Sequence, residues 1–174
     1  RLTVERLIKF KEGRKIEHKA TFRRCTKEQI EKESLKWKVL SVVGSFLNTA
    51  GGDVLIGVEN NTGKKLGIAF DYFKNEDAYV RKISSAIRAS LGEVTNSVVT
   101  RVIDLKDDEG NDVKICWIHI KPSIKPIYLC HKKYNNERKL GAGYKEFYVR
   151  DGESSVPLDM EEAHGYIKEH FPNY

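Results

Sequence analysis

The chain has 174 residues, of which 40% are hydrophobic and 32% charged, and its formal net charge is +6. A chain of this length can bury a core, and we expect residues 1–174 to be one domain, which can be a fragment of a longer protein because the sequence does not begin with Met. The composition excludes a disordered chain, and no apolar run reaches the ~20 residues of a membrane helix, so we expect no membrane partner.

The amino-terminal half shows alternating helical and strand patterns. Thr26, followed three residues later by Gln29, predicts a capping box at the start of a long helix, and a double glycine ends that helix. The expected elements in this half are a helix over 3–11, a strand over 15–22, a helix ending near 48–52 and a strand over 54–58, which is buried on both faces.

The carboxyl-terminal half adds more strands than helices. Residues 132–143 are charged and rich in glycine and amides, which predicts a loop. The other expected elements are a helix from Asn75 or Asp77 to Gly92, strands over 97–105, 113–120, 127–130 and 146–150, and a last helix capped by Asp159. Together these patterns predict an α+β fold with a mixed, mostly antiparallel sheet flanked by about four helices.

The three cysteines, at positions 25, 116 and 130, are odd in number and far apart. None belongs to a CxxC pair, so neither a structural zinc site nor a disulfide framework is expected. Free thiols are typical of a reducing compartment, and we therefore expect a cytoplasmic protein.

Acidic side chains come from separate segments of the sequence. Glu12 and Glu17 lie near the amino terminus, and Glu59-Asn60 follows the buried strand. Lys19 lies two residues after Glu17, so both point to one face of a strand, while His18 points to the other. If the segments converge, their oxygens can hold Mg²⁺ or Mn²⁺. The alternative is that these are ordinary surface residues.

Basic residues cluster in two parts of the chain, with aromatic residues among them. Such a pattern fits contacts with the phosphate backbone of a nucleic acid, with tyrosine rings stacking on unpaired bases. The alternative is a solvated charged face. The candidate nucleic-acid-binding residues are Arg23, Arg24, Lys132, Lys133, Arg138, Lys139 and Arg150, together with Tyr134 and Tyr144.

Four short motifs occur in an order that resembles one known family. They are Glu12 followed by Glu17-His18-Lys19; Phe46-Leu47-Asn48-Thr49-Ala50-Gly51-Gly52; Ile56-Gly57-Val58-Glu59-Asn60; and Phe147-Tyr148-Val149-Arg150. Together they resemble the Schlafen AlbA-like domain, which is also called a putative DNA-binding or divergent AAA-type domain. The resemblance covers nearly the whole chain.

The resemblance implies a lobe that, in Schlafens, pairs with a second similar lobe to grip RNA. A single copy would need a homodimer or an intramolecular partner domain. In Schlafen nucleases three carboxylates carry metal-dependent RNA cleavage, and two of them match Glu12 and Glu17. The third is an aspartate, where this chain has Glu59-Asn60.

The leading hypothesis is therefore an RNA endonuclease of the tRNA-cleaving kind that uses Mg²⁺ or Mn²⁺. Its catalytic residues would be Glu12, Glu17, Lys19 and Glu59, and its metal ligands would be Glu12, Glu17, Glu59 and Asn60. The alternative is a non-catalytic DNA- or RNA-binding or oligomerisation module of a larger regulatory or defence protein. In either case the expected partner is nucleic acid, and RNA before DNA.

Overall fold

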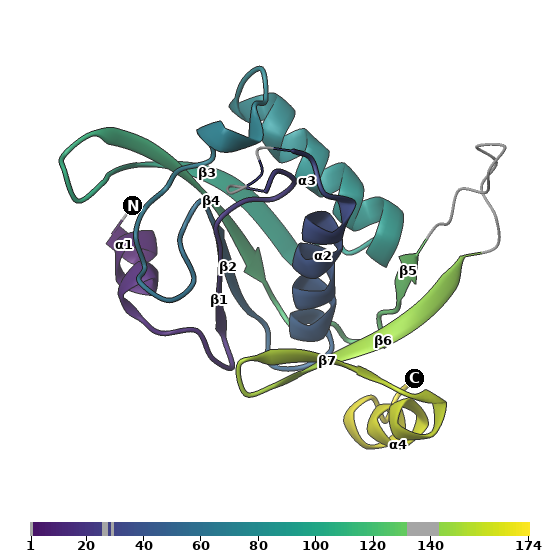
Figure 1. The fold of residues 1–174 in the computed structure, drawn as a ribbon. Helices are drawn as coiled ribbons and strands as arrows, with labels where there is room; N and C mark the ends of the chain where they lie inside the picture. The colour runs from purple at the N-terminus through teal and green to yellow at the C-terminus, as the bar shows by residue number, and fades with distance from the viewer. Residues whose placement is uncertain (1, 26–27, 29, 132–142) are drawn as a thin grey trace, which may run out of the picture.

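The computed structural model describes residues 2–25, 28, 30–131 and 143–174. Within these residues it forms helices and strands that are mixed along the chain (Figure 1). They are, in order, α1 (Leu2–Lys9), β1 (Ile16–Lys19), α2 (Glu33–Leu47), β2 (Gly52–Ile56), the 3₁₀ turn η1 (Ala69–Asp71), α3 (Glu76–Leu91), β3 (Val98–Lys106), β4 (Asp112–Ile120), β5 (Leu129–His131), β6 (Tyr144–Asp151), β7 (Ser154–Leu158) and α4 (Met160–His170).

The described strands form two sheets. One has the order β1-β2-β4-β3, with β1 parallel to β2 and the other pairs antiparallel. The second has the order β5-β6-β7 and is antiparallel throughout. The predicted α+β class is confirmed, but the strands do not form the single sheet that was expected. Strand β7 was not predicted, because Pro157 argues against a strand in the sequence. Proline is tolerated at the edge of a sheet, which is where β7 lies.

Helices cover both faces of the four-stranded sheet. Helix α2 lies against one face, beside α3, and also contacts β6, while α1 lies on the opposite side (Figure 1). Val54 and Ile56 of β2 pack into the large core under α2, whereas Leu55 packs with Val4 and Ile8 of α1. Strand β2 is therefore buried on both faces, as its apolar run predicted.

Helix α2 starts later than the sequence suggested. It begins at Glu33, because the chain before it folds back in a short antiparallel bridge between Arg24 and Glu31. The backbone N–H of Lys32 donates to the carbonyl of Arg23 at 2.8 Å, which closes this turn. The expected capping residues Thr26 and Gln29 lie outside the described residues.

The end of α2 is fixed by glycines and by one buried amide. Gly51 has φ +71°, and a Cβ on Gly52 would lie 2.9 Å from the Phe46 ring, so both positions favour glycine. The side chain of Asn48 donates to the carbonyls of Ile127 (2.8 Å) and Tyr148 (2.9 Å). The predicted sharp turn is confirmed, and Asn48 also joins it to the second sheet.

Helix α3 begins and ends, and α4 begins, where local signals predicted, whereas α1 ends at Lys9, before the expected residue 11. The side chain of Asn75 accepts a hydrogen bond from the N–H of Ala78 at 2.8 Å, and Gly92 follows α3 with φ +79°. Asp159 caps α4 through a reciprocal capping box with Glu162. All three cysteines are free thiols, and burial raises the pKa of the Cys116 thiol far above its usual value.

Candidate nucleic-acid interface

Glu17 and Lys19 share one face of β1, as their spacing predicted. The parallel register pairs them with Val54 and Ile56, which places both on the face covered by α2. Glu17 is only 5% exposed, and one of its carboxylate oxygens contacts the ammonium group of Lys19. The other, Oε2, lies 2.8 Å from Nη2 of Arg150, an ion pair outside hydrogen-bond geometry. Glu17 is thus a buried anion between two cations.

Arg150 has a structural role in this arrangement. Its side chain is 2% exposed, and its guanidinium donates to the carbonyl of Gly13 at 2.7 and 3.1 Å and to the hydroxyl of Ser155 at 3.3 Å. It also lies 4.9 Å from the centre of the Phe46 ring. A side chain so buried cannot reach a phosphate without rearrangement, so Arg150 is not part of the candidate interface, contrary to the prediction.

Glu12 caps the free edge of β1. Its Oε1 accepts a hydrogen bond from the backbone N–H of His18 at 2.8 Å. The His18 side chain is 2% exposed and points to the face opposite Glu17, beside Leu55. Among the described residues neither ring nitrogen of His18 has a hydrogen-bond partner. Glu12 therefore contacts the backbone of the strand that carries Glu17, but the two carboxylates have different partners.

Glu59 and Asn60 lie in the turn after β2. Glu59 is exposed and accepts a hydrogen bond from the Thr62 hydroxyl, while its backbone pairs with Lys64 and Gly63. Asn60 lines a cleft together with Glu12, but neither Glu17 nor Glu59 is among the residues lining it. The structure thus brings together one acid and one amide of the four predicted metal ligands.

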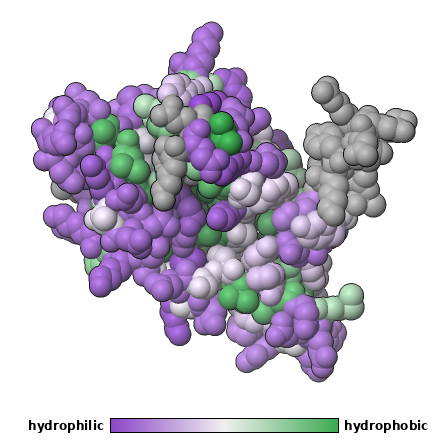
Figure 2. Space-filling model, viewed as in Figure 1, coloured by the Kyte–Doolittle hydropathy of each residue, from purple (hydrophilic) through white to green (hydrophobic). Residues whose placement is uncertain are grey.

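This polar cleft has a volume of about 450 Å³ and lies where the α1–β1 connection meets the turn after β2. The side of the molecule that carries α1 is largely hydrophilic (Figure 2). The polar residues that line the cleft are Lys9, Lys11, Glu12, His18, Asn60, Asn61, Thr62 and Glu153. Glu12 and Glu153 offset the charge of Lys9 and Lys11 within the lining, so attraction for an anion has to come also from the exposed Arg14 and Lys15 nearby in the chain. The amides and the hydroxyl can add hydrogen bonds to such a ligand.

The sequence reasoning missed several lining residues of the polar cleft. Lys9 and Lys11 flank the end of α1, and Glu153 comes from the β6–β7 turn. The run of exposed cations at positions 9, 11, 14 and 15 was a usable signal for the first two. Nothing local marks Glu153, because only the folding of β6 and β7 brings it to the amino-terminal segment.

The residues do not fit a divalent metal site as they are arranged. Among the described residues no group of at least three His, Cys, Asp or Glu side chains is placed to hold a metal ion. Glu17, which the resemblance implies as a ligand, is already paired with Lys19 and Arg150. Two cations at that carboxylate would repel an incoming divalent ion, and Asn60 brings no charge to offset the repulsion.

The backbone N–H groups of Arg23 and Arg24 donate to the carboxylate of Asp71, while their guanidinium groups have other partners. The guanidinium of Arg23 donates to the Asp71 carbonyl at 2.9 Å, pairs with Glu31 at 3.0 Å and lies over the Phe73 ring. Arg24 lies over the Tyr72 ring, 4.6 Å from its centre. Both arginines are partly exposed, and neither lines the polar cleft. They remain candidates for phosphate contacts at a separate place.

The second basic cluster falls mostly outside the described residues. This applies to Lys132, Lys133, Tyr134, Arg138 and Lys139. Tyr144 is described: it is 48% exposed at the start of β6, and its ring stacks on that of His131.

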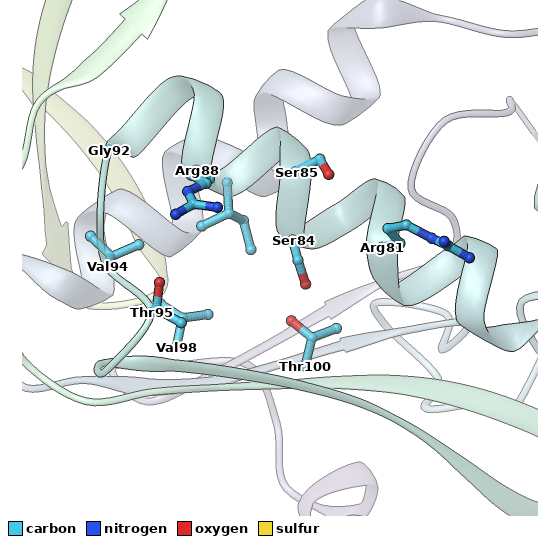
Figure 3. A pocket seen from close by; sticks show the side chains of 10 residues that line it. Arg81, Ser84, Ser85, Arg88, Gly92, Val94, Thr95, Val98 and Thr100 are labelled. Atoms are coloured by element: carbon cyan, nitrogen blue, oxygen red, sulfur yellow. The ribbon is translucent and has the colours of Figure 1, made fainter.

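A further hollow of about 210 Å³ lies between α3 and β3 (Figure 3). The hydroxyl groups of Ser84 and Thr100 point toward each other across it, while Arg81 extends away along the helix. Arg88 is paired with Glu93 at 2.6 Å. The cations therefore do not converge here, and this hollow is a weaker candidate than the polar cleft.

The fold and the polar cleft define an α+β lobe with a surface that combines lysines, carboxylates and amides. The family described as Schlafen, AlbA_2 matches residues 12–159, and the chain belongs to this family. Membership indicates a nucleic-acid-related function. Within the described residues, no helix combines the length and the apolar character needed to span a membrane.

A solved structure supports the fold assignment. The DIP2311 protein from Corynebacterium diphtheriae is similar with a TM-score of 0.54 and 18% sequence identity, over 90% of this chain and 24% of that protein. The chain thus spans about a quarter of the length of this relative, and the similarity concerns the fold alone. No curated protein matches the chain significantly.

Proposed function

We propose that this chain is a nucleic-acid-binding module that holds RNA without cleaving it. The observation that supports this proposal best is the state of Glu17, which is buried between Arg150 and Lys19 instead of facing an open metal site. The polar cleft, in contrast, presents Lys9 and Lys11 on an exposed surface.

The cations of the α1–β1 connection supply the attraction for phosphates. Lys9, Lys11, Arg14 and Lys15 are all exposed within a short stretch of chain. Phosphate contacts release condensed counterions, so affinity should fall steeply with salt. The amides of Asn60 and Asn61 add donors and acceptors that can contact sugar hydroxyls or base edges. We expect that a second copy of the chain, or another domain of a longer protein, completes the RNA-binding surface around the polar cleft.

Charge reversal at the polar cleft tests this proposal. The variant Lys9→Glu/Lys11→Glu should bind a fluorescent single-stranded RNA at least about tenfold more weakly, and the slope of log affinity against log salt should become shallower by about 1.4. Fluorescence anisotropy over a salt series measures both quantities.

A matched control separates the cleft from general attraction. The variant Lys82→Glu/Lys168→Glu changes the net charge equally, but its exposed lysines lie on α3 and α4, outside the cleft lining. It should keep most of the affinity. Equal losses in the two variants would mean that RNA is attracted by overall charge and that the cleft is not the interface.

The second candidate function is metal-dependent RNA cleavage. It is favoured by the meeting of Glu12 and Asn60 in one cleft, beside the strand that carries Glu17. If our proposal is correct, total tRNA incubated with the chain and Mn²⁺ gives the same gel pattern as total tRNA incubated with the chain and a chelator. New products that require Mn²⁺ and disappear in Glu12→Gln would overturn the non-catalytic proposal. Glu12 suits this test because its carboxylate is less buried than that of Glu17.

A further inference from the structure

An aromatic cleft lies between α2 and the second sheet, apart from the polar cleft. Its volume is about 470 Å³. The aromatic side chains lining it are Trp37 from α2, His131 from β5, and Tyr144 and Tyr148 from β6. Ser34 and Ser41 of α2 also line it.

The periods of the two elements explain why these side chains meet. Ser34, Trp37 and Ser41 recur at helical spacing, so they lie on one side of α2. Tyr144 and Tyr148 alternate with their neighbours along β6 and share one face of that strand. The contact between α2 and β6 then brings the two rows together.

The rings form a continuous row. Tyr144 and His131 are stacked with centroids 4.5 Å apart and an angle of 6° between their planes. His131 and Trp37 are also 4.5 Å apart, at a tilt of 34°. Glu146 pairs with His131 and accepts a hydrogen bond from the Tyr148 hydroxyl at 3.0 Å. Burial, and then the hydrogen bond to this neighbouring carboxylate, raise the pKa of Tyr148 to about 12.

The surroundings of the row favour an anionic strand over an apolar partner. Lys38 lines the aromatic cleft and is exposed. Lys36, whose ammonium is paired with Glu33, lies 5.0 Å from the centre of the Trp37 ring. In the sequence, the basic pairs Lys132-Lys133 and Arg138-Lys139 come between His131 and Tyr144. An aromatic face beside cations is the combination that binds single-stranded nucleic acids, because every base has a π-face and every nucleotide a phosphate.

We propose that the aromatic cleft binds one unpaired base of a single-stranded nucleic acid, which stacks against the row formed by the half-exposed Tyr144, His131 and Trp37. The phosphate of that nucleotide then lies within reach of Lys38. This inference rests on the proposed function, to which it adds a preference for single-stranded segments.

Two ligands separate base stacking from phosphate attraction. One is a short single-stranded RNA, and the other is an abasic strand with the same number of phosphates. The RNA should bind about tenfold more tightly than the abasic strand, and Tyr144→Ala should remove most of that difference. Tyr144→Phe keeps the ring and should bind as the parent chain does. Tyr174→Ala, at an exposed tyrosine near the carboxyl terminus, is the matched control.

The tryptophan spectrum provides a second readout. In a Trp117→Phe background, Trp37 is the only tryptophan, and its emission should respond to the RNA but not to the abasic strand. Equal binding of both strands, or an unchanged affinity in Tyr144→Ala, would overturn the base-stacking proposal and leave phosphate binding intact. Failure of the parent chain to bind either strand would overturn both proposals.

Discussion

Replacement of Arg150 by methionine should lower the free energy of unfolding by about 3 kcal/mol or more, because it leaves the Glu17 carboxylate buried with only one of its two cations. Methionine keeps an unbranched side chain over Phe46, so the loss of packing is small. The guanidinium also satisfies the carbonyl of Gly13, which loses its donor in the variant. Urea unfolding followed by circular dichroism measures the change.

The ion pair itself can be separated from packing with a second substitution. The variant Glu17→Gln/Arg150→Met removes both members of the buried Glu17–Arg150 pair and leaves only the partly exposed ammonium of Lys19 without its carboxylate, so it should be more stable than the sum of the two single changes predicts. Lys168→Met, on the exposed side of α4, should change the stability by less than about 0.5 kcal/mol. Additive effects of the two substitutions would show that Arg150 contributes only through packing and its carbonyl contacts.

The same result bears on the proposed function. If Glu17 and Arg150 are coupled in stability, the carboxylate that the family resemblance assigns to a metal is used to join β1 to the second sheet. Ser45 and Ser155 form a further link between α2 and β7 at 2.9 Å. A metal ligand at position 17 would have to break this junction before it could bind an ion.

Local signals in the sequence predicted both ends of α3 and the start of α4. Asn75, Gly92 and Asp159 act within one turn of their helices, so their effect can be read from neighbouring residues. The division into two sheets was not predictable in this way. The second sheet is joined to the rest of the fold by Asn48 and Arg150, whose partners lie far away in the sequence.

The candidate site shows the same limit. Strand alternation predicted that Glu17 and Lys19 share a face and that His18 lies on the other, and both expectations are confirmed. Alternation says nothing about which segment covers that face, and the buried partner Arg150 was therefore assigned to phosphate contacts. Charge in a sequence marks a candidate for binding, but burial decides whether the charge is available.

Asp71 is a second buried charge on which the basic segment before α2 depends. Its side chain is fully buried and accepts hydrogen bonds from the backbone N–H groups of Phe22 (2.9 Å), Arg23 (3.0 Å) and Arg24 (3.2 Å). It also accepts from the hydroxyl groups of Thr21 and Tyr79, both at 2.9 Å. No pattern in the sequence around the short 3₁₀ turn marks this aspartate.

Asp71→Ala should therefore destabilise the chain by about 4 kcal/mol, since several buried donors lose their acceptor at once. Tyr79→Phe removes one of these bonds and should cost about 1 kcal/mol. A loss below about 1 kcal/mol in Asp71→Ala would mean that the donors find other partners. Equilibrium unfolding in urea, compared with the parent chain, distinguishes these outcomes.

Alkaline pH gives an independent test of the same cluster. Burial, and then the charge of Asp71, raise the pKa of Tyr79 well above its usual value. Above about pH 10 the unfolded chain loses this proton while the folded chain keeps it, so stability should fall by up to about 1.4 kcal/mol per pH unit from this residue. Tyr79→Phe should show a shallower decline in stability, because it lacks the hydroxyl that titrates. The decline due to Cys116, which begins near pH 8.5, is common to both proteins and does not affect the comparison. Identical slopes in the two proteins would show that Tyr79 ionises in the folded chain as readily as in the unfolded one, and that Asp71 does not hold it in a buried bond.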